Sequence, residues 1–399
     1  MIAEPVTLVD QADILAVQVR NIQSAGAVHS RARGAVRARR RLTLVFRFRL
    51  GIVVAPTPGA AMQTFWAKTA TTVATSPPGG VRDTAVDRRR MISELRPRDR
   101  IGWLYLGWAT TCTATALWLS ATHSVVAWIA GQLLLAAALN QWFVLLHESG
   151  HSTLFRTKAL HKPVGHVAAF FAGIPYVSWK AVHALHHRWT GWQDLDPTTA
   201  DLVPRQLPRG QRMLVDFCWR TWLPLFSILY RTNNYWNLPR LFGFFDDRRQ
   251  RRRLVTNASA QLVAYGVVIV ALGPVHLLKL VGLGTLIALV FQDVLILSQH
   301  THIPQDRARG SHVKPIPAID QEEYTRSLDF PPWFARWVLL NVNDHELHHM
   351  YPSVPAWDLP RLGHATRNRN GWLHFVVEAK RLRGEVFLFK NRDETGAPI

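Results

Sequence analysis

Histidines grouped at short spacings are the residues of this sequence best able to do chemistry. Three segments, HESGH, HALHH and HELHH, each hold two or three of the chain's 18 histidines. Residues three or four apart share one face of a helix, so each segment presents at least two imidazoles together. The grouped histidines are His147 and His151, then His183, His186 and His187, and then His345, His348 and His349.

These groups predict a site for metal ions. The segment QHTH adds a fourth group, in which His300 is the expected ligand and His302 an alternative. Imidazole suits iron, zinc and copper. A zinc site uses three or four ligands, so nine histidines are too many for one ion and suit two ions, each with room for water or oxygen. The remaining histidines stand alone and are assigned no role: His29, His123, His161, His166, His276, His312, His364 and His374.

HESGH also fits a different metal motif. In H-E-x-x-H zinc proteases the two histidines bind zinc and the glutamate, here Glu148, is the general base. An intramembrane zinc protease is therefore an alternative function, but it leaves seven other clustered histidines unexplained. In a site with two metals, Glu148 would instead orient a ligand or pair with a cation.

Several carboxylates could orient the ligands, because a metal-bound imidazole usually donates its other N–H to a carboxylate or carbonyl. The candidates are Asp194, Asp196, Asp293, Asp344 and Glu346. Asp293 falls in an apolar segment, where an acid is costly and commonly functional. Asp194 and Asp196 fit solvated loop residues equally well.

Four apolar segments must position the histidines. They cover residues 101–120, 124–146, 254–272 and 277–298, and each has about the 20 residues needed to cross a bilayer. Short turns join the first to the second and the third to the fourth. We therefore expect an all-α integral membrane protein with four transmembrane helices in two hairpins, although the mean hydropathy of the whole chain is only +0.00.

Arginines predict the orientation of these spans. The chain carries 47 Lys and Arg against 27 Asp and Glu, a formal net charge of +20, and arginines crowd the approaches to the first and third spans. By the positive-inside rule both approaches are cytoplasmic, which puts all four histidine groups and both termini on that side. Attraction to anionic membrane lipids is a second effect of this charge. No nucleic-acid partner is expected, because the basic residues flank spans and form no separate module.

Other segments complete the expected organisation. Residues 164–178 and 214–230 are apolar and are expected to lie at the membrane interface. The domain division is an Arg-rich, poorly ordered extension (1–95), a catalytic domain (96–375) and a C-terminal tail (376–399). Alternatively, translation starts at Met62 or Met91. Five aromatic residues fit an interfacial belt better than the lining of an acyl tunnel: Trp179, Trp189, Trp192, Tyr230 and Trp236.

A pair of histidine-bound metals against a membrane indicates dioxygen activation on a lipidic substrate. A histidine-rich metal transporter is less consistent, since its ligands would lie near the middle of the membrane. Cys112 and Cys218 are the only cysteines, too few for a cysteine-ligated iron–sulfur cluster within the chain.

The motifs HESGH, HALHHRWTGWQDLDPT, LSQHTHIP and NVNDHELHHMYPSVPAWDLPRL resemble those of the membrane fatty acid desaturase superfamily in order and spacing. The resemblance extends over residues 96–369. It implies a four-helix membrane unit under a cytoplasmic helical cap that holds two irons by histidines. The implied ligands are His147, His151, His183, His186, His187, His345, His348 and His349, with His300 contributed after the fourth span.

The reaction implied by the resemblance uses O2 and two electrons to remove hydrogen from a methylene of a lipid or acyl substrate. A second hydrogen abstraction leaves a double bond, which is the expected outcome. Insertion of oxygen, as in related lipid, alkane or carotenoid hydroxylases and ketolases, is the alternative. The sequence shows neither a cytochrome b5-like haem segment nor a cysteine cluster. The electron donor is therefore expected to be a separate protein, a ferredoxin with its reductase or one of cytochrome b5 type.

Overall fold

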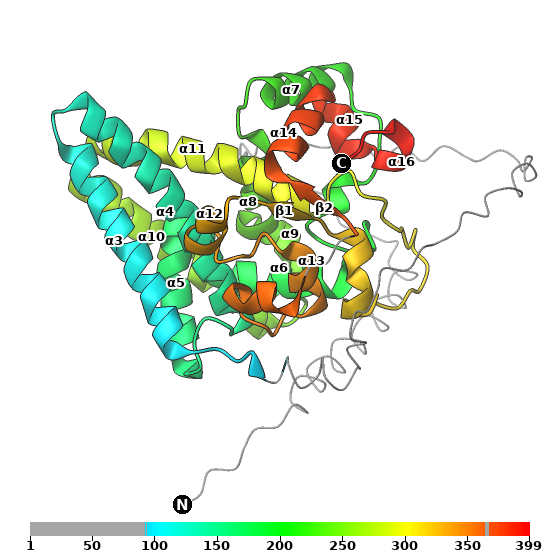
Figure 1. Ribbon diagram of the computed structural model, residues 1–399, viewed down its shortest axis with the longest axis horizontal. Helices are drawn as coiled ribbons and strands as arrows, with labels where there is room; N and C mark the ends of the chain where they lie inside the picture. Colours follow the sequence, from blue (N-terminus) through cyan, green and yellow to red (C-terminus); the bar gives the residue numbers. More distant parts are fainter. Residues whose placement is uncertain (1–91, 93, 364–366) are drawn as a thin grey trace, which may run out of the picture. The chain divides into compact units, whose positions relative to one another are not determined.

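Four long helices occupy the predicted spans in the computed structural model, which describes residues 92, 94–363 and 367–399 (Figure 1). They are α3 (Asp99–Ala121), α4 (Val125–His151), α10 (Arg248–Leu272) and α11 (Pro274–His300). Within the described part of the chain, three of them, α4, α10 and α11, are long and apolar enough to cross a membrane. A crossing by α3, the pairing into hairpins and the cytoplasmic side remain predictions.

Local sequence signals set the ends of these helices. The Ser124 hydroxyl accepts a hydrogen bond from the Ala127 N–H at the start of α4, and Asp247 caps α10 in the same way. Gly273, at a φ of +76°, separates α10 from α11, which begins with Pro274. Apolar side chains remain exposed along these two helices, such as Val270 at 86% and Val275 at 82%, as expected for a surface that faces lipid.

Close packing joins α3, α4 and α11. A Cβ at Gly131 of α4 would lie 2.8 Å from the Ala116 carbonyl oxygen of α3, and one at Gly284 of α11 would lie 2.9 Å from the Gln132 carbonyl oxygen of α4. The Gln132 amide donates to the Ser120 hydroxyl and to the Leu280 carbonyl, each at 2.8 Å. Small residues and buried polar groups are the usual means of helix association in a membrane.

Shorter elements follow each pair of long helices. After α4 come η1 (Lys158–Leu160), α5 (His161–Ala172), α6 (Tyr176–Trp189), η2 (Ala200–Leu202), α7 (Arg209–Arg220), α8 (Leu225–Arg231), η3 (Thr232–Trp236) and α9 (Leu238–Phe244). After α11 come η4 (Ala318–Tyr324), β1 (Ser327–Asp329), α12 (Pro332–Trp337), α13 (His345–Met350), η5 (Ala356–Leu362), β2 (Arg369–Gly371), α14 (Trp372–Arg381), α15 (Gly384–Phe389) and α16 (Arg392–Thr395). The parallel pair β1–β2, in which Ser327 lies opposite Arg369, was not expected.

The two apolar segments expected at the membrane interface differ. Residues 164–178 form most of α5 and the start of α6, and many of their side chains are buried in the main hydrophobic core. Residues 214–230 form most of α7 and α8. In α7, Met213, Leu214 and Phe217 are exposed while Trp219 is buried. The second segment therefore presents the broader apolar surface, while Val167 is the exposed large apolar side chain among the described residues of the first.

The C-terminal residues belong to a second core. Trp219 of α7, Phe375 of α14 and Phe387 of α15 are buried together there. In Figure 1 these helices gather beside the C-terminus. The predicted domain boundaries stay predictions, and nearly all of the N-terminal extension, with the alternative starts at Met62 and Met91, lies outside the described residues.

Candidate metal centre

Four separate elements bring the clustered histidines to one place. The last turns of α4 carry His147 and His151, and His300 is the final residue of α11. Helix α6 carries His183, His186 and His187, and α13, a helix of six residues, carries His345, His348 and His349. All nine side chains are buried or half-buried.

The histidines form two adjacent groups. The ligand atoms of His147, His151, His183 and His348 lie within 4.8 Å of one another, as do those of His186, His300, His345 and His349. The ninth, His187, adjoins the first group, because its Nε2 lies 3.1 Å from Nε2 of His183 and 3.0 Å from Nε2 of His348. His302 lies elsewhere: its Nε2 is 2.7 Å from the Thr395 hydroxyl and its ring stacks on Phe387.

The outer ring nitrogens of four histidines have fixed partners. Nδ1 of His147 lies 3.0 Å from Glu148, and Nδ1 of His186 lies 2.7 Å from Asp196. Nδ1 of His300 lies 3.1 Å from the Tyr324 carbonyl oxygen, and Nδ1 of His349 lies 2.9 Å from the Gln321 side-chain oxygen. These acceptors hold a proton on Nδ1 and leave the Nε2 lone pair directed toward the other histidines.

The inner nitrogens converge without enough protons to satisfy one another. Nε2 of His345 lies 3.0 Å from Nε2 of His300 and 3.1 Å from Nε2 of His349, whose own proton is held on Nδ1. Nε2 of His147 is buried and has no hydrogen-bond partner among the described residues. A metal ion would satisfy these converging lone pairs by accepting them as ligands. An all-imidazole set fits a first-row transition metal.

Burial keeps five of these imidazoles neutral. Desolvation, followed by the proximity of the other histidines, lowers the pKa of five of them well below its ordinary value: His183, His187, His345, His348 and His349. A neutral imidazole is the form that binds a metal.

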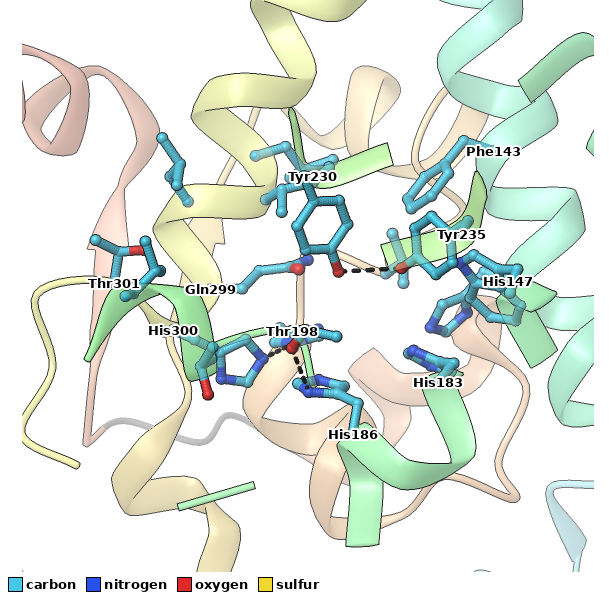
Figure 2. A pocket seen from close by; sticks show the side chains of 18 residues that line it. Phe143, His147, His183, His186, Thr198, Tyr230, Tyr235, Gln299, His300 and Thr301 are labelled. Atoms are coloured by element: carbon cyan, nitrogen blue, oxygen red, sulfur yellow. Dashed lines mark hydrogen bonds between the residues drawn. The ribbon is translucent and has the colours of Figure 1, made fainter. Parts of the chain in front are cut away.

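A cavity of about 700 Å³, part of it open to solvent, adjoins both groups. His147, His183, His186, His300 and His345 contribute to one wall, and Phe143, Leu295, Leu297 and Val342 are among its apolar lining. Figure 2 shows Tyr230 and Tyr235 across the cavity from His183 and His186, with their hydroxyls 3.2 Å apart. Burial raises the pKa of Tyr230 to about 12, so its hydroxyl keeps its proton.

Two of the five aromatic residues assigned to an interfacial belt line this cavity instead. Trp179 is buried and stacks on His183, and Tyr230 points into the cavity. The others lie outside its lining: Trp192 donates to the Lys314 carbonyl, Trp236 donates to the Gly173 carbonyl and Trp189 lies under Arg188. Aromatic composition predicted membrane proximity but could not separate these two roles.

Of the five acids proposed to orient ligands, Asp196 contacts a histidine of the site. Asp194 accepts hydrogen bonds from the backbone N–H groups of Ala308 and Arg309. The other three have these partners: Arg369 pairs with Asp344, the Asn368 N–H donates to Glu346, and the Ser227 N–H donates to Asp293. These contacts join segments of the fold and do not reach an imidazole.

Glu148 does not have the setting of a protease base. Its carboxylate lies on the Nδ1 side of His147, away from the converging Nε2 atoms. It also accepts hydrogen bonds from the Thr153 hydroxyl at 2.8 Å and the Ala356 N–H at 3.0 Å. It therefore links α4 to η5 and orients His147, which argues against the zinc protease alternative.

Three groups that contact these histidines were not expected from the sequence. Gln321 and the Tyr324 carbonyl come from η4, a segment with no chemical motif, so no sequence signal pointed to them. The Thr198 hydroxyl lies 2.9 Å from Nδ1 of His186. Thr198 follows Asp196 by two residues, in a motif in which the sequence assigned a role only to the acids.

Comparisons with known proteins identify related sequences. A sequence profile described as fatty acid desaturase matches residues 122–375. The sn-1 oleoyl-lipid 12-desaturase of Picosynechococcus sp. is 25% identical over 256 residues, which is 62% of this chain and 70% of that protein. A probable fatty acid desaturase of Sorghum bicolor is 25% identical over 55% of this chain and 58% of its own length. The acyl-lipid omega-3 desaturase (cytochrome b5) of Arabidopsis thaliana is 23% identical over 54% and 58%.

Proposed function

The chain belongs to the fatty acid desaturase family, and from this premise we propose that it introduces a carbon–carbon double bond into the acyl chain of a lipid. The observation that carries the proposal is the convergence of nine histidines from four elements at the wall of an apolar cavity. The names of two of its relatives describe desaturases of acyl lipids, which favours desaturation over the hydroxylation or ketone formation that a similar site can perform.

Two iron ions are the proposed metals. His147, His151, His183, His187 and His348 would hold one, and His186, His300, His345 and His349 the other. When bound, they would supply the means to use O2 and two electrons to remove two hydrogens from adjacent carbons. Asp196, Glu148, Gln321 and the Tyr324 carbonyl keep the outer nitrogens protonated and so hold the inner lone pairs in place.

The cavity walls would position the substrate. An apolar surface lies beside the histidines, where a methylene chain can bind. It is formed by Phe143 from α4, Leu295 and Leu297 from α11, and Val342. Trp179, stacked on His183, keeps that imidazole at the cavity wall. The carbon atoms of the acyl chain that lie nearest the histidines would be the ones that are oxidised.

The surroundings of the site follow from the same proposal. Helices α3, α4, α10 and α11 would cross the membrane, with the histidines and both termini on the cytoplasmic side. The electrons would come from a separate iron–sulfur or haem protein. The name of one relative includes cytochrome b5, which makes a donor of that type one candidate.

Lipid profiling tests the function. The chain is expressed in a host whose lipids lack the expected product, beside an inactive His186→Ala variant, and total acyl chains are compared by mass spectrometry. We expect new double bonds only with the unaltered chain. New hydroxyl groups would instead identify a hydroxylase. Acyl chains that stay unchanged with folded, iron-loaded protein, given an electron donor of each type, would contradict the proposal.

A further inference from the structure

The side chain of Gln321 links two of the histidine segments from outside every recognised motif. It lies in η4, is 2% exposed, and contacts both α6 and α13. On the basis of the proposed di-iron function, we infer that Gln321 is a positioning residue. Its amide holds His349 in the tautomer and orientation that metal binding requires, and anchors that histidine to the segment that carries His187.

The hydrogen bonds of Gln321 determine which way its amide points. Oε1 accepts a hydrogen bond from Nδ1 of His349 at 2.9 Å, and Nε2 donates to the carbonyl oxygens of His187 at 2.8 Å and Ile316 at 3.1 Å. If the amide were reversed, Oε1 would face two carbonyl oxygens. The reversed orientation is therefore strongly disfavoured, and Oε1 must face His349.

This orientation determines the protonation of His349. An amide oxygen can only accept, so Nδ1 of His349 must carry the proton and Nε2 must carry the lone pair. That lone pair lies among the second group of histidines, 3.1 Å from Nε2 of His345.

The backbone around Gln321 supports neighbouring ligands of the same group. Three residues later, the Tyr324 carbonyl accepts from Nδ1 of His300. Arg326 donates to the carbonyls of Ser298 and Thr301, on either side of His300, at 2.6 and 3.0 Å. The segment from Gln321 to Arg326 thus contacts two of the four histidines in this group. The Tyr324 carbonyl accepts from His300, and the Gln321 side chain accepts from His349.

A positioning role and a purely structural role make different predictions for two substitutions. Gln321→Leu removes the acceptor for His349 and both donated hydrogen bonds. Gln321→Glu keeps an acceptor for His349 but, as a carboxylate, also loses both donated hydrogen bonds and places an oxygen against the carbonyls of His187 and Ile316. A matched control is Gln261→Leu in α10: Gln261 is also buried, at 6% exposed, and donates to the Ala169 carbonyl at 3.1 Å, far in sequence from every clustered histidine.

The test is iron binding by the full-length, metal-free protein in detergent, titrated with Fe²⁺ under anaerobic conditions against a competing chelator. Loss of an outer partner of a metal ligand commonly weakens metal binding about 10- to 100-fold. We expect Gln321→Leu to weaken the binding of one of two Fe²⁺ ions by this factor. Gln321→Glu should stay within a few fold of the unaltered protein, and Gln261→Leu should bind both ions normally. Thermal unfolding of each metal-free variant reports the structural cost separately.

Three results would overturn the inference. Unchanged Fe²⁺ affinity in Gln321→Leu would show that His349 needs no such partner. Equal weakening in the leucine and glutamate variants would assign the effect to the carbonyl bonds. Weakening in Gln261→Leu of the same size would make it a general consequence of lost stability. If the unaltered protein itself binds no Fe²⁺, the proposed function fails, and this inference fails with it. That result differs from normal Fe²⁺ binding by both the unaltered protein and Gln321→Leu, which would overturn this inference alone.

Discussion

His186 shows how a few neighbouring side chains would prepare an ordinary imidazole to bind a metal, as we propose that it does. Its Nδ1 lies 2.7 Å from the Asp196 carboxylate, which in turn accepts from the Thr198 N–H at 2.8 Å and the Thr198 hydroxyl at 2.9 Å. Burial raises the pKa of Asp196, but its interaction with His186 and these hydrogen bonds outweigh burial and hold the pKa below its ordinary value. Asp196 is therefore ionised and can only accept a hydrogen bond. An acceptor at this place holds the proton of His186 on Nδ1 and so fixes the orientation of the ring.

Replacing Asp196 tests this contact. Asp196→Asn removes the ionised acceptor and should lower iron affinity and product formation by about 10- to 100-fold. Asp194→Asn is the matched control: Asp194 lies two residues away and, among the described residues, accepts hydrogen bonds from the backbone N–H groups of Ala308 and Arg309. Iron content and acyl products of both variants are measured together. Equal losses in the two would argue against a specific role for Asp196.

The histidines themselves give a second comparison at this scale. His186→Ala and His348→Ala should abolish product formation while insertion into the membrane stays normal, because ligand loss leaves the long helices intact. His300→Ala should behave in the same way. His302→Ala should retain product, because His302 contacts Thr395 and Phe387 and not the other histidines. Activity in the His300 variant together with inactivity in the His302 variant would reverse the ligand assignment.

The elements differ in how far the sequence predicted them. Helices α4, α10 and α11 were expected because a long apolar run is a local property of the chain. The motifs predicted that α6 and α13 would carry ligands, but not which acceptor each ligand would use. The contact of Gln321 with the His187 carbonyl joins residues 134 positions apart and leaves no periodic signal. Asp196 and Asp194 have the same residue type and the same motif, and only their folded surroundings separate them.

Packing between α3 and α4 offers a test at the scale of elements. A Cβ at Gly131 would lie 2.6 Å from the Ser120 hydroxyl oxygen and 2.8 Å from the Ala116 carbonyl, and backbone cannot easily yield. We expect Gly131→Ala to destabilise the protein by about 1–3 kcal/mol, as overpacking commonly does. Gly266→Ala in α10, where a Cβ meets nothing within 4 Å, is the control and should be neutral or slightly stabilising. The midpoint of thermal unfolding in detergent distinguishes them, and equal midpoints would contradict the packing argument.

The described part of the molecule combines an exposed apolar surface with a histidine-lined cavity that is partly open to solvent. Exposed apolar residues on α10 and α11 fit a bilayer, and the arginines at residues 248, 249 and 251–253 begin α10. If these arginines are cytoplasmic, the cavity opens on the side where soluble electron carriers are present. The acyl chain would then reach the histidines from the membrane and the electrons from the cytoplasm.

Sidedness can be measured by labelling introduced cysteines. Exposed positions suit this purpose: His123, between α3 and α4, and Asp246, just before α10. A membrane-impermeant maleimide added to intact cells should label His123→Cys and leave Asp246→Cys unlabelled until the cells are opened. The natural cysteines, Cys112 and Cys218, are buried and can be replaced by serine to lower background. The opposite labelling pattern would place the histidines outside the cell and exclude a cytoplasmic electron donor.

The central claim is that nine histidines hold two irons. Its most direct test is the metal content of the detergent-purified protein from cells grown in iron-rich medium, determined by elemental analysis. We predict close to two irons per chain with little zinc, falling sharply in His186→Ala and His348→Ala. One zinc per chain with no iron would contradict the claim and restore the zinc protease alternative based on His147, His151 and Glu148.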